Sequence, residues 1–366
     1  MFNGIPSVIC KKNGDTVRLR CRHITEEILY VVLNEFLRKF FIFIEPVLSN
    51  KGQGSTFYAI NRNEIINLLI KLPPLSEQRK IVEILDQADE LRRKRKEADE
   101  KAGKILQALF YKMFGDPTVN SMGWELIELG NPDVCEINPR LKRNGLDEDS
   151  IVSFIPMADI EEKYGRIIGT QTRPYSQVKK GFTYFENNDV LFAKITPCMQ
   201  NGKAAIAYDL INGTGFGSTE FHVLRPKKKS TSAWLFSLVR LPYFRKLAEQ
   251  NFTGSVGQQR VPSDFIKNFK VGCPPIDLQI QFEKIFNNTF SRIEKCESAR
   301  IKNDKEIEVL VHHAFTGQLT SGYRERNKTK LEAELAEQLK AIEEANKTKS
   351  QNQKKTTVKK VSKKKG

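Results

Sequence analysis

The chain has 366 residues, of which 39% are hydrophobic and 28% are charged, and its formal net charge is +16 at pH 7. This length allows two or three domains, and the basic balance favours a polyanionic partner such as nucleic acid. The most apolar window, residues 28–44, contains Glu35, Arg38 and Lys39, so it cannot span a bilayer. We therefore expect a soluble cytoplasmic protein with no membrane partner.

The first 114 residues predict a small mixed region followed by a long helix. Residues 1–72 combine a short β-type run at 17–20 with an apolar helical stretch at 26–40. Residues 76–114 lack proline, and Gly115-Asp116-Pro117 gives a strong stop signal. With Arg95 filling one gap, the apolar or small residues of this helix follow a heptad and predict a packing seam: Ile84, Ala88, Leu91, Ala98, Ala102, Ile105 and Leu109.

Residues 118–273 have a different pattern, with short β-type runs between Gly, Asn and Pro turns. The runs lie at 151–155, 190–193 and 221–224, and one amphipathic helix is predicted at 232–251. A second long helix follows at 276–315. Its apolar seam is predicted to contain Phe286, Phe290, Ile293, Ile307 and Val311.

The second helix repeats the first at an offset of 201 residues. Leu72–Gln78 reads LPPLSEQ and Cys273–Gln279 reads CPPIDLQ, and Phe114 pairs with Phe315 at the same offset. This period is too long for a solenoid repeat, so it indicates a duplicated unit of one globular domain and one helix. We expect an α+β fold whose mostly-β domains with small helices are separated by two long helices packed as an antiparallel coiled coil. The alternative is that each helix packs on its own domain.

The C-terminal segment is strongly basic. Residues 321–366 carry 14 Lys and Arg against 6 Glu, which is half of the net charge. A short helix is predicted at 331–345, but the rest is too polar to fold, so the segment as a whole is predicted to be a basic, disordered tail.

Familiar catalytic and cofactor motifs do not occur in the sequence. The six cysteines form no CxxC, and neither GxxxxGK[ST] nor GxGxxG is found. We expect no metal, no cofactor and no catalytic residue. One weak alternative is a Mg²⁺-dependent nuclease using Asp133, Glu161 and Lys163, a pattern that often arises by chance.

Polar residues gather instead in three runs, 194–203, 217–220 and 253–260. Gln, Asn and Arg pair with base edges, whereas Lys, Ser and Thr serve phosphates, although ordinary turns also use these residue types. The candidate DNA-binding residues are Lys194, Thr196, Gln200, Asn201, Lys203, Thr219, Thr253, Gln258, Gln259 and Arg260.

These motifs together resemble those of the specificity subunits of type I restriction–modification systems. The resemblance rests on four segments in the order of the family, across about residues 17–320: 73–82 (PPLSEQRKIV), 189–198 (DVLFAKITPC), 217–221 (GSTEF) and 257–262 (GQQRVP). It implies a non-catalytic subunit whose two target-recognition domains read a split DNA site. The paired helices would act as a spacer and would dock two modification (methyltransferase) subunits and a restriction subunit. Those partners would carry S-adenosylmethionine, ATP and Mg²⁺.

The resemblance also divides the chain up to residue 320 into four segments. They are a partial first recognition domain (1–72), a first spacer helix (73–117), a second recognition domain (118–273) and a second spacer helix (274–320). The basic tail (321–366) follows them and goes beyond the family pattern. Only about 72 residues precede the first Pro-Pro pair, against about 155 in the second domain. Two alternatives therefore stay open: self-association of two chains through their helices, or a remnant that occupies modification subunits without reading DNA.

Overall fold

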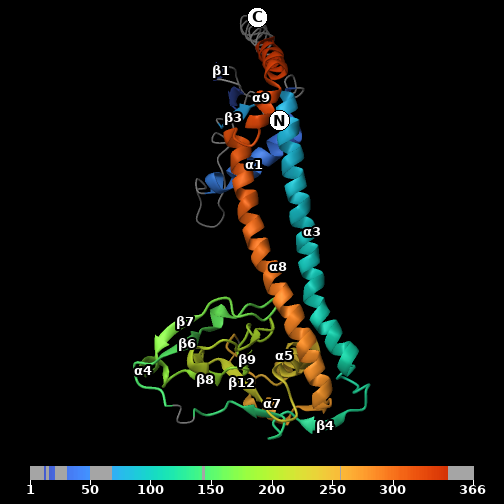
Figure 1. The fold of residues 1–366 in the computed structure, drawn as a ribbon, viewed down its shortest axis with the longest axis vertical. Coiled ribbons are helices and arrows are strands. Elements are labelled where there is room, and N and C mark those ends of the chain that lie inside the picture. The colour runs from blue at the N-terminus through green and yellow to red at the C-terminus, as the bar shows by residue number, and fades with distance from the viewer. Residues whose placement is uncertain are drawn as a thin grey trace, which may run out of the picture. The chain divides into compact units, whose positions relative to one another are not determined.

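The computed structural model describes residues 12–13, 16–20, 31–49, 68–141, 145–255 and 257–344. The chain forms two compact units, and each is described by itself: unit 1 comprises 1–96 and 299–366, and unit 2 comprises 97–298. Two long helices, α3 (Leu75–Phe114) and α8 (Ile276–Thr316), contribute residues to both units (Figure 1). Both the α+β class and the two long helices were predicted from the sequence.

Unit 1 combines a small antiparallel sheet with helices. Its sheet has the order β1-β2-β3, and the β-type run predicted at 17–20 lies in β2. Its further helices include a segment at 328–344. The bounds of the named elements are β1 Lys12–Asn13, β2 Thr16–Arg20, α1 Asn34–Ser49, β3 Leu69–Leu72 and α9 Ser321–Arg326.

Aromatic packing forms the core of unit 1. Phe315, near the end of α8, contacts the rings of Phe36, Phe40 and Phe43 on one face of α1, at centroid distances of 5.4, 5.5 and 5.1 Å. Ile81 from the first turns of α3 joins the same core. The start of α3 therefore packs with the end of α8, which makes the two helices antiparallel in this unit. The helical stretch predicted at 26–40 is confirmed from residue 34 onward, but residues 31–33 precede the α-helix. Residues 26–30 lie outside the described part of the chain.

The helix predicted at 331–345 is confirmed as far as residue 344, whereas the prediction of a disordered tail from residue 321 is wrong for residues 321–344. Residues 328–344 are helical, and Leu335 and Ile342 are 3% and 2% exposed in the core of unit 1. Glu334 accepts a hydrogen bond from the backbone N–H of Ser76 at 3.0 Å, where its negative charge caps the first turn of α3. The apolar residues of this short segment fold because unit 1 supplies a core for them. Residues 345–366 lie outside the described part of the chain.

Unit 2 contains two four-stranded sheets and a two-stranded ribbon. One sheet is antiparallel with order β10-β9-β12-β5, and the other has order β7-β6-β11-β8, in which β11 and β6 are parallel. The ribbon joins β13 to β4. The strands are β4 Glu125–Glu128, β5 Cys135–Ile137, β6 Ile151–Ile155, β7 Gln171–Pro174, β8 Thr183–Glu186, β9 Val190–Ala193, β10 Ala204–Ile206, β11 Thr214–Gly217, β12 Phe221–Pro226 and β13 Lys270–Cys273. All three predicted strand runs are confirmed.

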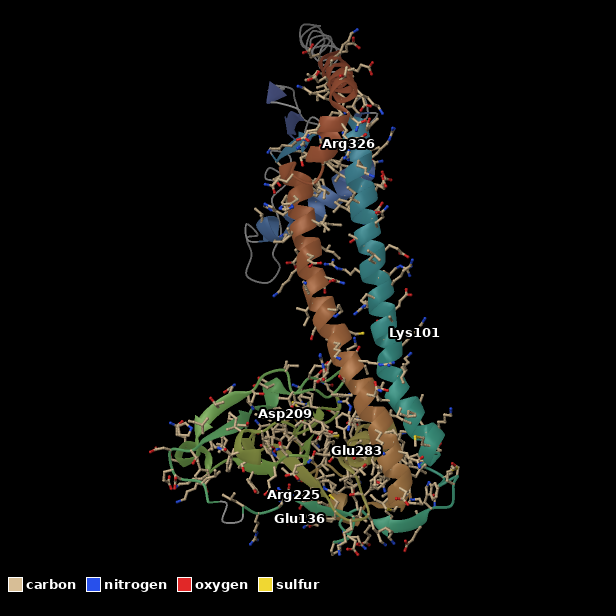
Figure 2. The ribbon with its side chains drawn as sticks, in the orientation of Figure 1. Lys101, Glu136, Asp209, Arg225, Glu283 and Arg326 are labelled. Atoms are coloured by element: carbon tan, nitrogen blue, oxygen red, sulfur yellow. The ribbon has the colours of Figure 1, made fainter. Side chains whose placement is uncertain are left out.

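The helices of unit 2 lie against both sheets. They are η3 Met157–Asp159, α4 Tyr175–Val178, η4 Ile211–Gly213, α5 Ser232–Arg240, α6 Pro242–Gln250 and α7 Ser263–Asn268. Helices α5 and α7 contact the antiparallel sheet, whereas α4 and η4 contact the sheet that contains β6 and β7. Glu283 of α8, which is labelled in Figure 2, accepts a hydrogen bond at 3.2 Å from the N–H of Ala233 in the first turn of α5. Phe114 of α3 contacts Phe282 of α8 at 4.9 Å, so the helices are also antiparallel here.

The single helix predicted at 232–251 is wrong, because the structure has two helices there. Leu241 between them has an extended backbone, with φ −60° and ψ 137°, and Pro242 begins α6. Proline has no N–H to donate to a preceding turn, and its ring clashes with a helical chain before it, so it starts a helix rather than continuing one.

The predicted seam of α3 is only partly buried. Ala88 is buried and Ile84 and Leu109 are partly buried, but Leu91 is 68% exposed, Ile105 is 51% exposed and Ala98 is exposed. The side chain of Ala102 lies outside the described set. The heptad prediction is therefore wrong for intramolecular packing at Leu91, Ala98 and Ile105. Each end of α3 instead buries a face with helical spacing in its own unit: Ile81, Leu85 and Ala88 in unit 1, and Leu106, Phe110 and Phe114 in unit 2.

The α8 seam fits better. Phe286 and Ile293 are buried, and Phe290, Ile307 and Val311 are partly buried. Packing of each helix end on its own unit, the alternative left open by the sequence, thus accounts for much of the burial.

The sequence duplication has a structural counterpart at the start of each long helix. Gln78 donates to the carbonyls of Val31 and Pro73 and accepts from the N–H of Leu33. Gln279 donates to the carbonyls of Lys229 and Pro274 and accepts from the N–H of Thr231. We call these three-bond arrangements the glutamine clasps. Each ties the start of a long helix to the chain that enters α1 or α5.

Candidate nucleic-acid interface

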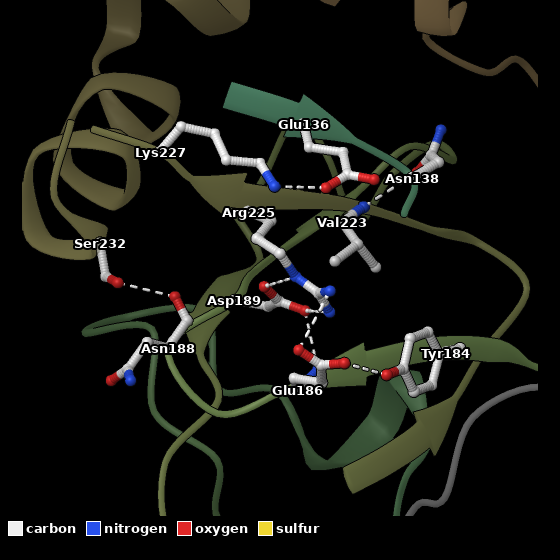
Figure 3. Close-up of polar contacts among 10 residues, drawn as sticks. All are labelled: Glu136, Asn138, Tyr184, Glu186, Asn188, Asp189, Val223, Arg225, Lys227 and Ser232. Atoms are coloured by element: carbon white, nitrogen blue, oxygen red, sulfur yellow. Dashed lines mark hydrogen bonds and ion pairs between the residues drawn. The ribbon is translucent and has the colours of Figure 1, made fainter. Parts of the chain in front are cut away.

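An ion pair fixes one end of the antiparallel sheet in unit 2. Arg225 of β12 makes two hydrogen bonds to Asp189, at 2.8 and 2.7 Å, and a third contact to Glu186 at 3.0 Å (Figure 3). The Asp189 side chain is 1% exposed, so the pair is held in a low-dielectric setting. It stabilises the register in which β12 runs antiparallel to β9.

The opposite end of the same two strands carries the predicted polar runs. The backbone N–H of Lys194, just after β9, donates to the carbonyl of Glu220, just before β12, at 2.9 Å. The N–H of Thr196 donates to Gln259 at 3.0 Å, and the N–H of Val261 donates to Lys194 at 2.9 Å. The described residues of the three runs, 194–196, 217–220, 253–255 and 257–260, are thus joined by backbone hydrogen bonds. We call the surface that they form the loop platform.

A second ion pair lies within the loop platform. The Nε and one Nη of Arg260 donate to the two carboxylate oxygens of Glu220, at 2.9 and 3.0 Å, and the other Nη donates to the carbonyl of Gln258 at 2.9 Å. These hydrogen bonds hold the pKa of Glu220 below its usual range. The Arg260 side chain is 40% exposed. Arg260 therefore braces the loop around Gln258 while it stays accessible from solvent.

His222 is a buried residue of β12 that connects the segment after the platform to the rest of unit 2 through hydrogen bonds. Its Nε2 donates to the carbonyl of Val261 at 2.8 Å, and its Nδ1 lies 3.1 Å from the side-chain amide of Asn138, which donates to it. This arrangement assigns the neutral imidazole with its proton on Nε2. Burial lowers the pKa of His222 below its ordinary value.

The exposed polar side chains of the platform agree with the predicted set in part. Thr219, Thr253 and Gln258 are exposed, and Lys194 and Gln259 are partly buried. The Oγ1 of Thr196 is buried and makes no hydrogen bond to the described residues, so this geometry does not present that hydroxyl to a ligand.

Three predicted residues belong to a separate cluster beside carboxylates. Gln200 donates to Glu249 at 2.5 Å and Asn201 donates to Glu162 at 3.1 Å. Lys203 donates to the carbonyl of Met157 at 3.3 Å and lies 3.9 Å from Glu162. Since these side chains already have acidic or carbonyl partners, they are less suited to phosphate contact than those of the loop platform.

The nuclease pattern gains no support from the structure. Glu161 accepts hydrogen bonds from the N–H groups of Lys163 and Tyr164 inside its own turn, and Lys163 lies 4.6 Å over the Tyr164 ring. Within the described ranges, no three His, Cys, Asp or Glu side chains are grouped so that they could hold a metal ion. In the same ranges, no helix is both long and apolar enough to cross a bilayer.

Sequence reasoning missed the residues that support the platform. Asp189 and Glu220 lie inside two of the recognised motifs, so their motif membership was a usable signal. Asn138 and His222 carry no local pattern, because their roles depend on contacts across 84 residues of chain.

Comparison with known proteins identifies the class. The family described as "Type I restriction modification DNA specificity domain" matches residues 17–100 and 122–303. Since this is more than half of the chain, the protein belongs to that family.

Individual relatives carry the same designation. The chain is 36% identical over 199 residues to the type I restriction enzyme EcoAI specificity subunit of Escherichia coli, a match that covers 54% of this chain and 33% of that subunit. It is 34% identical over 176 residues to the EcoEI specificity subunit of the same organism, covering 48% and 29% respectively. The matches thus span about a third of the length of these relatives.

Solved structures of the family resemble the chain loosely. The HsdS subunit of Thermoanaerobacter tengcongensis matches with 21% identity and a TM-score of 0.39, over 80% of this chain and 72% of that one. The type I S subunit of M. genitalium matches with 15% identity and a TM-score of 0.47, over 80% and 74%.

Proposed function

We propose that this chain is a DNA-binding specificity subunit of a type I restriction–modification complex, in which unit 2 reads one part of a split target. The observation that carries the proposal is the loop platform. Three polar runs that are distant in the sequence meet at one end of a sheet whose other end is fixed by Asp189 and Arg225. Family membership supplies the independent support.

The chemistry of the platform suits duplex DNA. The exposed amide of Gln258 can pair with the two adjacent major-groove groups of adenine, and Lys194, Thr219 and Thr253 can serve phosphates. The two N–H groups that the Arg260 guanidinium donates to Glu220 have the geometry to pair with the O6 and N7 atoms of guanine. Because the Arg260 side chain is partly exposed, it can release Glu220 and bind a base instead. A rigid platform lowers the ordering cost that loops otherwise pay on binding.

The remaining assembly follows from the family as part of the same proposal. The long helices would dock two modification subunits, which carry S-adenosylmethionine, and a restriction subunit that uses ATP and Mg²⁺. The exposed Leu91, Ala98 and Ile105 of α3 would then meet a partner rather than α8. The chain itself would hold no cofactor and carry out no catalysis.

Co-expression with the neighbouring modification subunit tests the proposal, with methylated positions read by sequencing that detects modified bases. An asymmetric two-part motif means that both units read DNA. A symmetric gapped motif means that two chains pair and that unit 2 does all the reading. If complexes form but no base is methylated, the chain acts as a remnant or inhibitor and the proposal fails.

A binding experiment isolates the platform. Arg260→Ala should weaken binding to the cognate duplex by about 1–3 kcal/mol and relax discrimination at one base pair. The matched control is Lys270→Ala, because Lys270 is an exposed cation of unit 2 that lies on β13. Unchanged discrimination between cognate and mismatched duplexes in Arg260→Ala would remove Arg260 from the base-reading set.

A further inference from the structure

A cavity in unit 2 has the lining of an anion site. It has a volume of about 190 Å³ and lies between the second half of α3 and the start of α6. Its polar lining consists of Gln107, Lys163, Ser237, Arg240 and Arg245, and Phe110, Tyr164 and Phe236 supply aromatic walls. Among the described residues that line it, three are cationic and none is an aspartate or a glutamate.

Two buried polar atoms in this lining lack a hydrogen-bond partner among the described residues. They are the Oγ of Ser237, whose residue is only 8% exposed, and the Nε of Arg245. A buried donor without an acceptor destabilises the folded state, so native structures rarely leave one unpaired without a ligand or water. Because Ser237 and Arg245 both contribute to the lining of this cavity, one acceptor group bound there could satisfy both donors.

The positive charge around the cavity is also poorly compensated. Within the part of the chain that the structure describes, the hydrogen bonds that Arg240 donates go to backbone carbonyls, those of Glu162, Lys163 and Gly202. Burial lowers the pKa of Arg240 to about 10, an effect that Glu161 opposes and Arg245 reinforces. Burial likewise lowers the pKa of Arg245. Cations withdrawn from water are normally stabilised by an anion, and none of the described residues that line this cavity is an aspartate or a glutamate.

We propose that this cavity binds a phosphate group, held by Lys163, Arg240, Arg245 and the hydroxyl of Ser237. Several N–H donors and one O–H donor without a carboxylate suit a tetrahedral oxyanion. The cavity is much larger than the space that one water needs. Arg240 and Arg245 also bind the carbonyls of Gly202 and Gln200, so an anion here would brace the loop at 200–203.

The test is isothermal titration of the full chain with inorganic phosphate, at an ionic strength held constant with chloride. We expect one saturable site, a roughly tenfold weaker dissociation constant in Ser237→Ala, and a larger loss in Arg245→Gln. The control is Lys246→Gln, which removes an exposed charge next to Arg245 outside the cavity lining. Thermal unfolding temperatures that rise with phosphate in the wild type but not in Arg245→Gln would confirm the site by a second readout.

A further arm identifies the source of the phosphate. If saturating duplex DNA abolishes phosphate binding and Arg245→Gln lowers the salt slope of DNA binding by about one unit, the occupant is a DNA backbone phosphate. If phosphate still binds beside DNA, the occupant is a free phosphate-bearing molecule. The proposal is overturned if Ser237→Ala and Arg245→Gln bind phosphate with the same dissociation constant as the wild type. It is also overturned if neither the wild type nor any variant binds phosphate. Neither result depends on whether the loop platform reads DNA.

Discussion

At the scale of single residues, the loop platform is held in place by side chains that are themselves buried. His222 is 5% exposed, yet it joins the carbonyl of Val261, which ends the platform, to Asn138 beyond β5. Asp189 similarly acts through Arg225 at the far end of the sheet. Positions of this kind determine the geometry of Gln258 and Arg260 because they hold the strands and loops from which those side chains project.

His222 should make the stability of unit 2 depend on pH. Because burial lowers its pKa, the unfolded imidazole binds a proton that the folded one does not, so stability falls as pH drops below about 6.5. The variant His222→Gln lacks this pH-dependent loss of stability. The difference in unfolding free energy between the wild type and His222→Gln should therefore narrow from pH 7 to pH 5. Urea denaturation at several pH values measures this difference in unfolding free energy. The control variant is His312→Gln, because His312 is exposed. Parallel pH profiles for wild type and His222→Gln would contradict the assignment.

At the scale of elements, the glutamine clasps explain why the two Pro-Pro segments resemble each other. In each, a buried glutamine satisfies three backbone groups at the junction of a long helix with a shorter one. Gln78 and Gln279 are both fully buried. No shorter side chain reaches all three groups, which gives the repeated glutamine a structural reason.

The clasps should act locally. Gln279→Ala and Gln78→Ala should each cost about 1–3 kcal/mol, since buried backbone groups lose their partners. Hydrogen exchange should show lost protection in α5 for the first variant and in α1 for the second. The exposed Gln281→Ala and Gln87→Ala serve as matched controls. Equal loss of protection in α1 and α5 from either single variant would show that the clasps do not act independently.

At the scale of the whole molecule, each unit completes its core with chain segments that are distant in the sequence. Unit 1 takes residues from 31–49, the start of α3, the end of α8 and 328–344. Residues 328–344 therefore belong to the folded protein, and Gln338 even shares the Val31 carbonyl with the clasp of Gln78.

Truncating Leu335 should destabilise unit 1 selectively. Leu335→Ala removes a side chain that is 3% exposed, and large-to-small changes of this kind cost about 2–5 kcal/mol. Thermal unfolding followed by limited proteolysis should show unit 1 cleaved first while unit 2 persists. The control Glu337→Ala lies on the exposed face of the same helix and should have little effect. Resistance of unit 1 equal to that of the wild type would mean that residues 328–344 do not support its core.

The sequence by itself determined the features that depend on local pattern. The two long helices, their stop at Gly115, the strand runs of unit 2 and the motifs of the family are all readable from residue order, because helical spacing, turn residues and motifs are local. The same is true of the three polar runs, although not of their arrangement.

Only the tertiary structure decided which of these residues meet. It brought together the described residues of the loop platform but kept Gln200, Asn201 and Lys203 beside carboxylates. It shifted the buried face of α3 away from Leu91 and Ile105, and it folded 328–344 onto unit 1. The physical reason is that burial and pairing depend on partners supplied by distant segments, and a periodic pattern specifies a face without specifying what covers it.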